Sequence, residues 1–145
     1  MAIMRPEAHA RAIAAVVGDL VDTREGATYF AEMISGIGLH YNLGGNHTLI
    51  GRSAPDFEFE DGTRLGTLLH NGKALLLEIS ESEKLRVLSE ARKPKLTYVS
   101  AKAKDTQGLA ALFIRPDGFV AWASESDPDF GDADAAVARW LGNAA

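Results

Sequence analysis

The side chains that could perform chemistry in this sequence are chiefly its four histidines, because the 145 residues include no cysteine. Thiolate redox chemistry, disulfides and cysteine-ligated metals are therefore excluded. His40 and His47 are separated by a glycine-rich stretch and lack the i, i+4 spacing of a helical zinc pair. His9 and His70 lie far from both in the sequence. We therefore expect no metal-ligating residue in this chain.

Patterns for the binding of calcium or of a nucleotide cofactor are also missing. The acidic run from Glu125 to Asp134 lacks the ordered carboxylates of a calcium loop. Gly44 and Gly45 precede extended chain rather than the N-terminus of a helix, so they cannot hold a dinucleotide pyrophosphate. The sequence thus predicts no catalytic and no cofactor-binding residue.

An independent small-ligand site would need polar groups that converge on a closed pocket. The candidates for such a site are Tyr41, His47, Arg52 and Tyr98.

Composition indicates an ordinary globular protein, with 46% hydrophobic and 24% charged residues. The net charge of −5 argues against nucleic acid as a partner, although residues 84–104 are locally basic. We interpret that basic stretch as a solvated helix face and loop. No apolar run approaches the ~18–20 residues that cross a bilayer, and no export signal is apparent, so we expect a cytoplasmic protein without membrane contact.

The elements that must position these side chains begin with a helical segment. Pro6 suits a first helical position, and Asp22 with Glu25 has the spacing of a capping box that starts a second helix, which Gly36 ends. Alternation over residues 37–43 predicts a short extended segment. We place the domain boundary after it, with a helical lead-in at 1–43 and an α/β domain at 44–145. The apolar stripe of the lead-in offers these candidates for an interface: Val17, Leu20, Phe30, Met33 and Ile34.

The α/β domain reads as a hairpin around Asp61-Gly62, a short helix, a strand, a helix, a strand, a second hairpin and a last helix. Residues 74–79 are nearly all apolar, which is typical of a strand covered on both faces. We expect Ser80 to cap the next helix, Pro94 to stop it, and Asp132 to cap the last helix. The order resembles a thioredoxin-like sheet, a central mixed sheet flanked by helices, with parallel central strands.

Thioredoxins and peroxiredoxins place a reactive cysteine where this chain has Ser80 to Glu83. A serine hydroxyl is a poor nucleophile without an adjacent base, and none is evident here. We therefore interpret Ser80 as a helix cap and this position as catalytically empty.

Several motifs together resemble one family, the C-terminal domains of FAD-dependent aromatic-ring and polyketide hydroxylases. They are Gly51 to Phe57 with Asp61 to Leu65, Ala31 to Gly36 with His40-Tyr41, Leu112 to Trp122, and Arg139 to Gly142. The resemblance extends from about Asp22 to Gly142. Peroxiredoxins share the Ala-Pro-Asp-Phe start in weaker form, but the missing cysteine eliminates a cysteine-dependent peroxidase.

The resemblance implies a parent monooxygenase that uses FAD, NAD(P)H and molecular oxygen. In that family the flavin and the substrate are held by a large N-terminal part that this sequence lacks, so no functional residue is carried over. One hypothesis is therefore a non-catalytic domain that contacts a flavin-binding hydroxylase body, on the same or a neighbouring polypeptide, or its own copy as a homodimer. The alternative is a stand-alone ligand-binding protein or enzyme without thiol chemistry.

Overall fold

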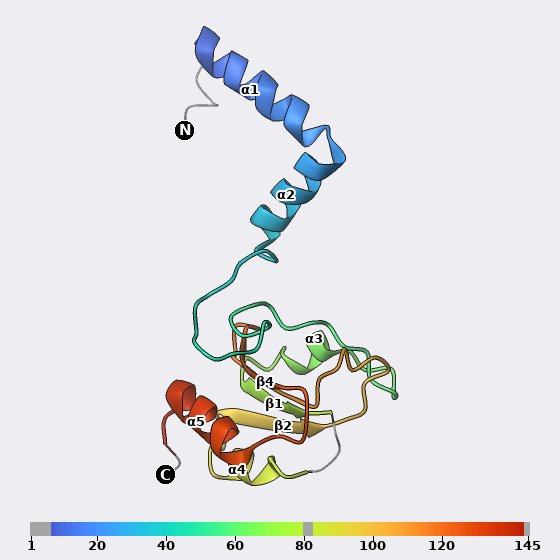
Figure 1. Cartoon of the computed structure of the whole chain (residues 1–145), viewed down its shortest axis with the longest axis vertical. Helices are drawn as coiled ribbons and strands as arrows, with labels where there is room; N and C mark the ends of the chain where they lie inside the picture. Colours follow the sequence, from blue (N-terminus) through green and yellow to red (C-terminus); the bar gives the residue numbers. More distant parts are fainter. Residues whose placement is uncertain (1–6, 80–82, 144–145) are drawn as a thin grey trace. The chain divides into compact units, whose positions relative to one another are not determined.

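The computed structural model describes residues 7–79 and 83–143, which divide between Leu39 and His40 into two compact units (Figure 1). The domain assignment of 1–43 and 44–145 stays a prediction. Among the described residues, no helix combines the length and apolar character that crossing a bilayer requires. Pro6 and Ser80, on which the sequence places two helix starts, lie outside the described residues.

The first unit is a pair of helices, α1 (Ala8–Val21) and α2 (Arg24–Ser35). The cap of α2 is Thr23 and not Asp22, because the Thr23 hydroxyl accepts the Gly26 N–H at 3.0 Å. Gly36 ends α2 with a positive φ of 76°, as the sequence predicts. Within α2 no residue is buried, and in α1 only Ala10 is. Within this unit, the apolar stripes of these helices are therefore largely uncovered.

The second unit is built on a four-stranded sheet in the order β2-β1-β3-β4. Its elements are α3 (Leu65–Leu68), β1 (Ala74–Glu78), α4 (Arg86–Glu90), β2 (Leu96–Ser100), β3 (Ala111–Ile114), β4 (Val120–Ser124) and α5 (Phe130–Leu141). The pair β1–β2 is parallel, while β1–β3 and β3–β4 are antiparallel. This order and these directions confirm the thioredoxin-like sheet.

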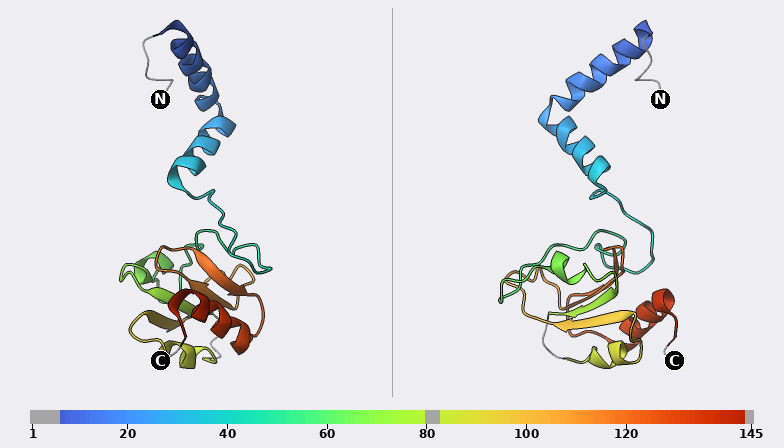
Figure 2. Two further views of the ribbon diagram at one scale, coloured as in Figure 1. Left: turned by 90° about the vertical axis from the view of Figure 1, so that its left-hand side faces the viewer. Right: turned by 180° about the vertical axis from the view of Figure 1, so that it is seen from behind.

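Each face of the sheet carries its own apolar layer, and the ribbon in Figure 2 places α3 on one side of the sheet and α4 and α5 on the other. Alternation along β1 sends Leu75 and Leu77 to one face, where they pack with Phe57 and Leu65 from the segment that contains α3. Leu76 goes to the other face, which α4 and α5 cover, the latter with Ala133 and Val137 among others. Residues 74–79 are all buried, which confirms that this strand is covered on both faces.

Three further expected details are wrong. The segment at 37–43 is not extended throughout, because residues 37–38 lie in a turn that the Leu39 N–H closes by donating to Gly36 O at 3.0 Å. Helix α4 begins at Arg86 and ends at Glu90, before the expected stop at Pro94. Helix α5 is capped by Asp129, whose carboxylate accepts the N–H of Asp132, so Asp132 lies in the first turn instead of capping it.

Candidate functional site

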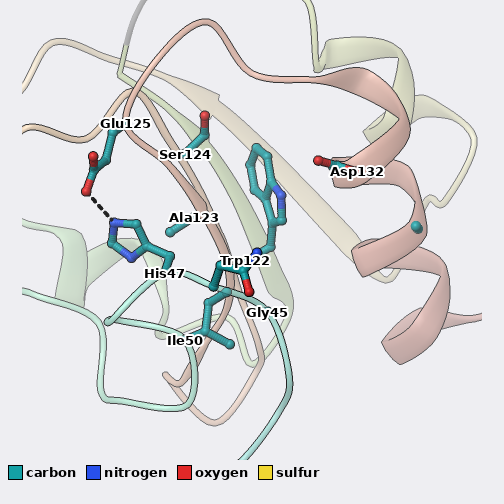
Figure 3. Close-up of a pocket in the computed structure, with 10 residues that line it drawn as sticks. Gly45, His47, Ile50, Trp122, Ala123, Ser124, Glu125 and Asp132 are labelled. Carbon is teal, nitrogen blue, oxygen red and sulfur yellow. Dashed lines mark hydrogen bonds and ion pairs between the residues drawn. The ribbon is translucent and has the colours of Figure 1, made fainter.

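An open groove of about 590 Å³ lies between the loop at residues 45–50, the end of β4 and the start of α5. Figure 3 shows His47 on the loop, Trp122 and Ser124 on β4, Glu125 just after β4, and Asp132 on α5. Residues far apart in the sequence meet here because β4 runs along the sheet edge next to α5. The groove combines one aromatic ring with two carboxylates and one imidazole.

His47 is held by hydrogen bonds at both ring nitrogens. Its Nδ1 lies 3.2 Å from the Leu49 backbone N–H, and its Nε2 lies 3.2 Å from Glu125 Oε1. Because Nδ1 accepts a hydrogen bond from a backbone amide, we assign the ring N–H to Nε2, which donates a hydrogen bond to Glu125. The imidazole therefore has no free lone pair with which to act as a base.

Ser124, the hydroxyl of the groove, is bonded elsewhere. Its Oγ donates to Ser126 O at 3.0 Å, so it is not paired with His47. A serine nucleophile needs a base within hydrogen-bond reach, and this arrangement does not provide one. The groove is suited to binding and not to nucleophilic catalysis.

The groove does not fit a flavin cofactor. Its lining includes Glu125 and Asp132 but no lysine or arginine, and the pyrophosphate of FAD is an anion. No Gly-rich strand-to-helix turn leads into the groove. We derive no flavin chemistry from it. Among residues 7–79 and 83–143, no cluster of histidine, aspartate or glutamate could hold a metal ion.

A second cavity, of about 430 Å³, lies between α4 and β2 and contains Tyr98. The Tyr98 hydroxyl donates to Glu78 Oε2 at 2.8 Å, and the same oxygen accepts the Leu85 N–H at 3.2 Å. Burial, and then the bond to the Glu78 carboxylate, raise the pKa of Tyr98 to about 12. The hydroxyl thus stays protonated and ties β2 to the end of β1.

Sequence reasoning missed Glu78, which is completely buried. A carboxylate at the end of an all-apolar strand was the available signal, because glutamate is almost never fully buried unless it is paired. Trp122 and Glu125 were also missed as groove residues, since their meeting depends on how β4 passes the loop at 45–50.

The structure distributes the four predicted pocket residues over different places. His47 lines the large groove and Tyr98 the second cavity. Tyr41 borders a small hollow of about 150 Å³ and packs edge-on against Phe119, with ring centroids 4.8 Å apart. Arg52 is exposed and lies outside these three cavities. A shared ligand role for the four stays a prediction.

The candidate interface residues all lie in the helical unit. Leu20, Met33 and Ile34 are exposed, the last by 82%, while Val17 and Phe30 are half-buried. Met33 also borders a hollow of about 270 Å³ with Tyr29 and Leu39. Leu20, Met33 and Ile34 are thus not buried within the helical unit itself, and their role in an interface stays a prediction.

Comparison with known proteins gives one consistent family. A family model described as the C-terminal part of aromatic-ring hydroxylases matches residues 47–144. A monooxygenase of Claviceps purpurea (strain 20.1) is 40% identical over 141 residues, which is 96% of this chain and 28% of that protein. A dialkyldecalin synthase of Streptomyces rugosporus is 30% identical over 99% of this chain and 27% of its own length.

A solved structure agrees. OxyS, an anhydrotetracycline hydroxylase from Streptomyces rimosus, superposes with a TM-score of 0.77 at 30% identity, over 92% of this chain and 29% of that one. The chain spans less than a third of the length of each of these relatives. Since the family model covers well over half of its residues, the chain belongs to the family of aromatic-ring hydroxylase C-terminal domains.

Proposed function

We propose that the chain is a non-catalytic, structural domain that covers or joins the flavin-binding body of an FAD-dependent aromatic or polyketide hydroxylase. The body, on the same or a neighbouring polypeptide in the cytoplasm, would bind FAD and NAD(P)H and carry out the oxygenation. Alternatively, the surface that would contact the body joins two copies of this chain in a homodimer. The relatives support a shared architectural part, since a monooxygenase and a dialkyldecalin synthase both contain it.

The observation that carries the proposal is the uncovered apolar face of α2. This helix of 12 residues buries none of them, although Met33 and Ile34 stand on its surface. An isolated helix of this length is marginal in water, and helices in proteins owe most of their stability to packing of an apolar face. The face therefore favours a covering partner.

The relatives support the proposed partner. Within OxyS, about 29% of the chain aligns with this one, so the larger share of that protein is available to cover the same helices. Contiguous exposed apolar surface of this kind marks an interaction site more often than a monomer surface. We therefore assign the covering role to the flavin-binding body.

The test is co-purification of the full chain with the flavin-binding hydroxylase polypeptide encoded upstream or in a neighbouring gene. We expect a yellow complex with wild type and loss of the complex with Met33→Glu/Ile34→Glu. The matched control is Thr28→Glu/Ser35→Glu, which adds the same charges to polar positions of α2 and should leave the complex intact. Equal binding by both double variants would contradict the proposal, as would saturable FAD binding by this chain alone.

Light scattering of the chain by itself separates the two forms of the role. A dimer that Met33→Glu/Ile34→Glu converts to a monomer assigns the surface to self-association. A monomer that gains mass only with the flavin-binding polypeptide assigns it to the body.

The second candidate function, a stand-alone ligand-binding protein, is favoured by one observation. The groove at His47 and Trp122 has the volume of a small-molecule site, and its aromatic ring and polar groups line one cavity. A Trp122→Ala variant that abolished binding of a small ligand by the isolated chain would favour this function.

A further inference from the structure

We infer that the outer edge of β2 is a docking site for an extended, acidic peptide segment of a partner protein, which adds a fifth strand to the sheet. Strand β2 is the last strand on its side of the sheet. This inference is independent of the proposed function, because it involves only the second unit.

The direction of the backbone groups follows from the register. Lys95 O accepts the Ala74 N–H at 3.2 Å, and Glu78 O accepts the Ala101 N–H at 3.1 Å. The backbone N–H and C=O groups of the odd-numbered residues from 95 to 101 therefore point towards β1. By alternation, the N–H and C=O groups of Leu96, Tyr98 and Ser100 point away from β1. No other strand among the described residues pairs with them.

The same edge already pairs with an extended segment just beyond β2, at the isolated antiparallel bridge between Phe59 and Ala103. Glu60 N–H donates to Lys102 O at 3.0 Å, and Lys104 N–H donates to Glu58 O at 2.9 Å. The hairpin then turns back at Gly62, whose N–H donates to Phe59 O, so it does not continue along β2. The open stretch of five residues is about 16 Å long, enough for a short added strand.

The surroundings of this edge select an acidic occupant. The cavity of about 430 Å³ is lined by Leu96, Thr97 and Tyr98. Side chains of consecutive strand residues point to opposite faces of the sheet, so a cavity that touches all three extends along the edge of β2. Lys73, Arg86 and Lys93 also line it, against a single carboxylate, Glu90.

Two of the nearby cations are available for a partner. Lys93 pairs with Glu90 and Arg86 with Glu83, whereas Lys73 and Lys95 form no ion pair within residues 7–79 and 83–143. A second copy of this chain would bring its own lysines against these, and like charges across paired strands are destabilising. Charge complementarity therefore favours an acidic partner segment over pairing with a second copy. This edge is locally basic although the net charge of the whole chain is −5.

The probe is a capped peptide of about seven residues that alternates glutamate with valine, long enough to cover the open edge. With the full chain we expect hydrogen exchange to slow at the amides of Tyr98 and Ser100, and not at those of Thr97 and Val99, which already bond to β1. N-methylation of the peptide amides on one edge should abolish binding, while N-methylation on the opposite edge should not.

The charge requirement is tested with Lys73→Gln/Lys95→Gln, which should weaken binding about three- to tenfold. The control Arg52→Gln removes one positive charge beside β4, the strand at the opposite edge of the sheet, and should weaken binding less than about twofold and less than either single variant, Lys73→Gln or Lys95→Gln. Three results would overturn the inference: no protection at the outward amides, equal binding of both N-methylated peptides, or equal binding of a disordered polyglutamate of the same charge.

Discussion

Removal of the Tyr98 hydroxyl should destabilise the α/β unit, because that hydroxyl is a partner of a carboxylate that water cannot reach. Glu78 is fully buried, and the Tyr98 oxygen lies 2.8 Å from its Oε2. In Tyr98→Phe the ring remains to pack against α4 and beneath Arg86. The change therefore isolates one hydrogen bond to a charged group.

The magnitude follows from the burial of the acceptor. A hydrogen bond to a charged group contributes about 1.5–3 kcal/mol, and a buried acceptor deprived of its donor loses most of that. We expect the free energy of unfolding to fall by about 2 kcal/mol. Tyr41→Phe is the matched control, because Tyr41 is 46% exposed and its hydroxyl makes no hydrogen bond to other described residues. That variant should lie within about 0.5 kcal/mol of wild type.

The assay is urea unfolding followed by tryptophan fluorescence. Both tryptophans, Trp122 and Trp140, belong to the α/β unit, so the signal reports that unit alone. A double-mutant cycle with Glu78→Gln measures the coupling of the pair directly. If Tyr98→Phe were as stable as Tyr41→Phe, or if the cycle gave no coupling energy, the reasoning about the buried carboxylate would be refuted.

Three more predictions concern other features of the same unit. Since the pKa of Tyr98 is raised from 10.0 to about 12, the stabilising contribution of its hydroxyl is complete below pH 10 and is lost as the pH rises towards 12. In urea titrations, the difference in unfolding free energy between wild type and Tyr98→Phe should therefore shrink over that pH range. A constant difference would contradict the assignment. The side chain of Arg92 is only 5% exposed; its Nη2 lies 2.5 Å from Asp134 Oδ1, and its Nε has no partner among the described atoms. Because Asp134→Ala leaves this buried charge unpaired, it should lower the free energy of unfolding by about 3 kcal/mol, whereas Arg92→Met should stay within about 1 kcal/mol of wild type. The reverse ranking in calorimetry would be inconsistent with this account. Gly51 has a φ of +86°, and a Cβ at this position would lie 1.8 Å from Tyr41 O, whereas Gly62 has a similar φ but open space around it. Gly51→Ala should therefore lower the free energy of unfolding by roughly 3 kcal/mol, against about 1 kcal/mol for Gly62→Ala. Equal losses by thermal melting would show that the contact with Tyr41 O can relax.

Strong local signals made most of the α/β unit predictable. The apolar run at 74–79, the turn around Gly118 and the apolar face of the last helix each depend on residues adjacent in sequence. The strand order then follows from the handedness and short connections of such folds. Helix caps were less predictable, because Thr23 and Asp22 are both good caps, as are Asp129 and Asp132. The choice depends on backbone angles that neighbouring packing determines.

The candidate sites were much less predictable, because each depends on contacts between distant residues. His47 meets Glu125 across 78 positions of sequence, and Tyr98 meets Glu78 across 20. Nothing local to Tyr98 indicates a buried carboxylate partner. Residues 37–43 alternate like a strand, yet their backbone forms local turns and isolated hydrogen bonds, such as Tyr41 N–H to Gly51 O, instead of a ladder. Alternation alone is insufficient without a strand beside it.

The bare apolar face of α2 has a consequence for the life of the protein in a cell. A helix that buries none of its residues opens at little cost in free energy, and its backbone is then accessible to proteases. Exposed side chains such as Met33 and Ile34 are also the kind of surface that quality-control systems select. If the proposed flavin-binding body is a separate polypeptide, copies of this chain without it would be degraded faster than assembled ones. The uncovered helix would then match the amount of this chain to the amount of that body.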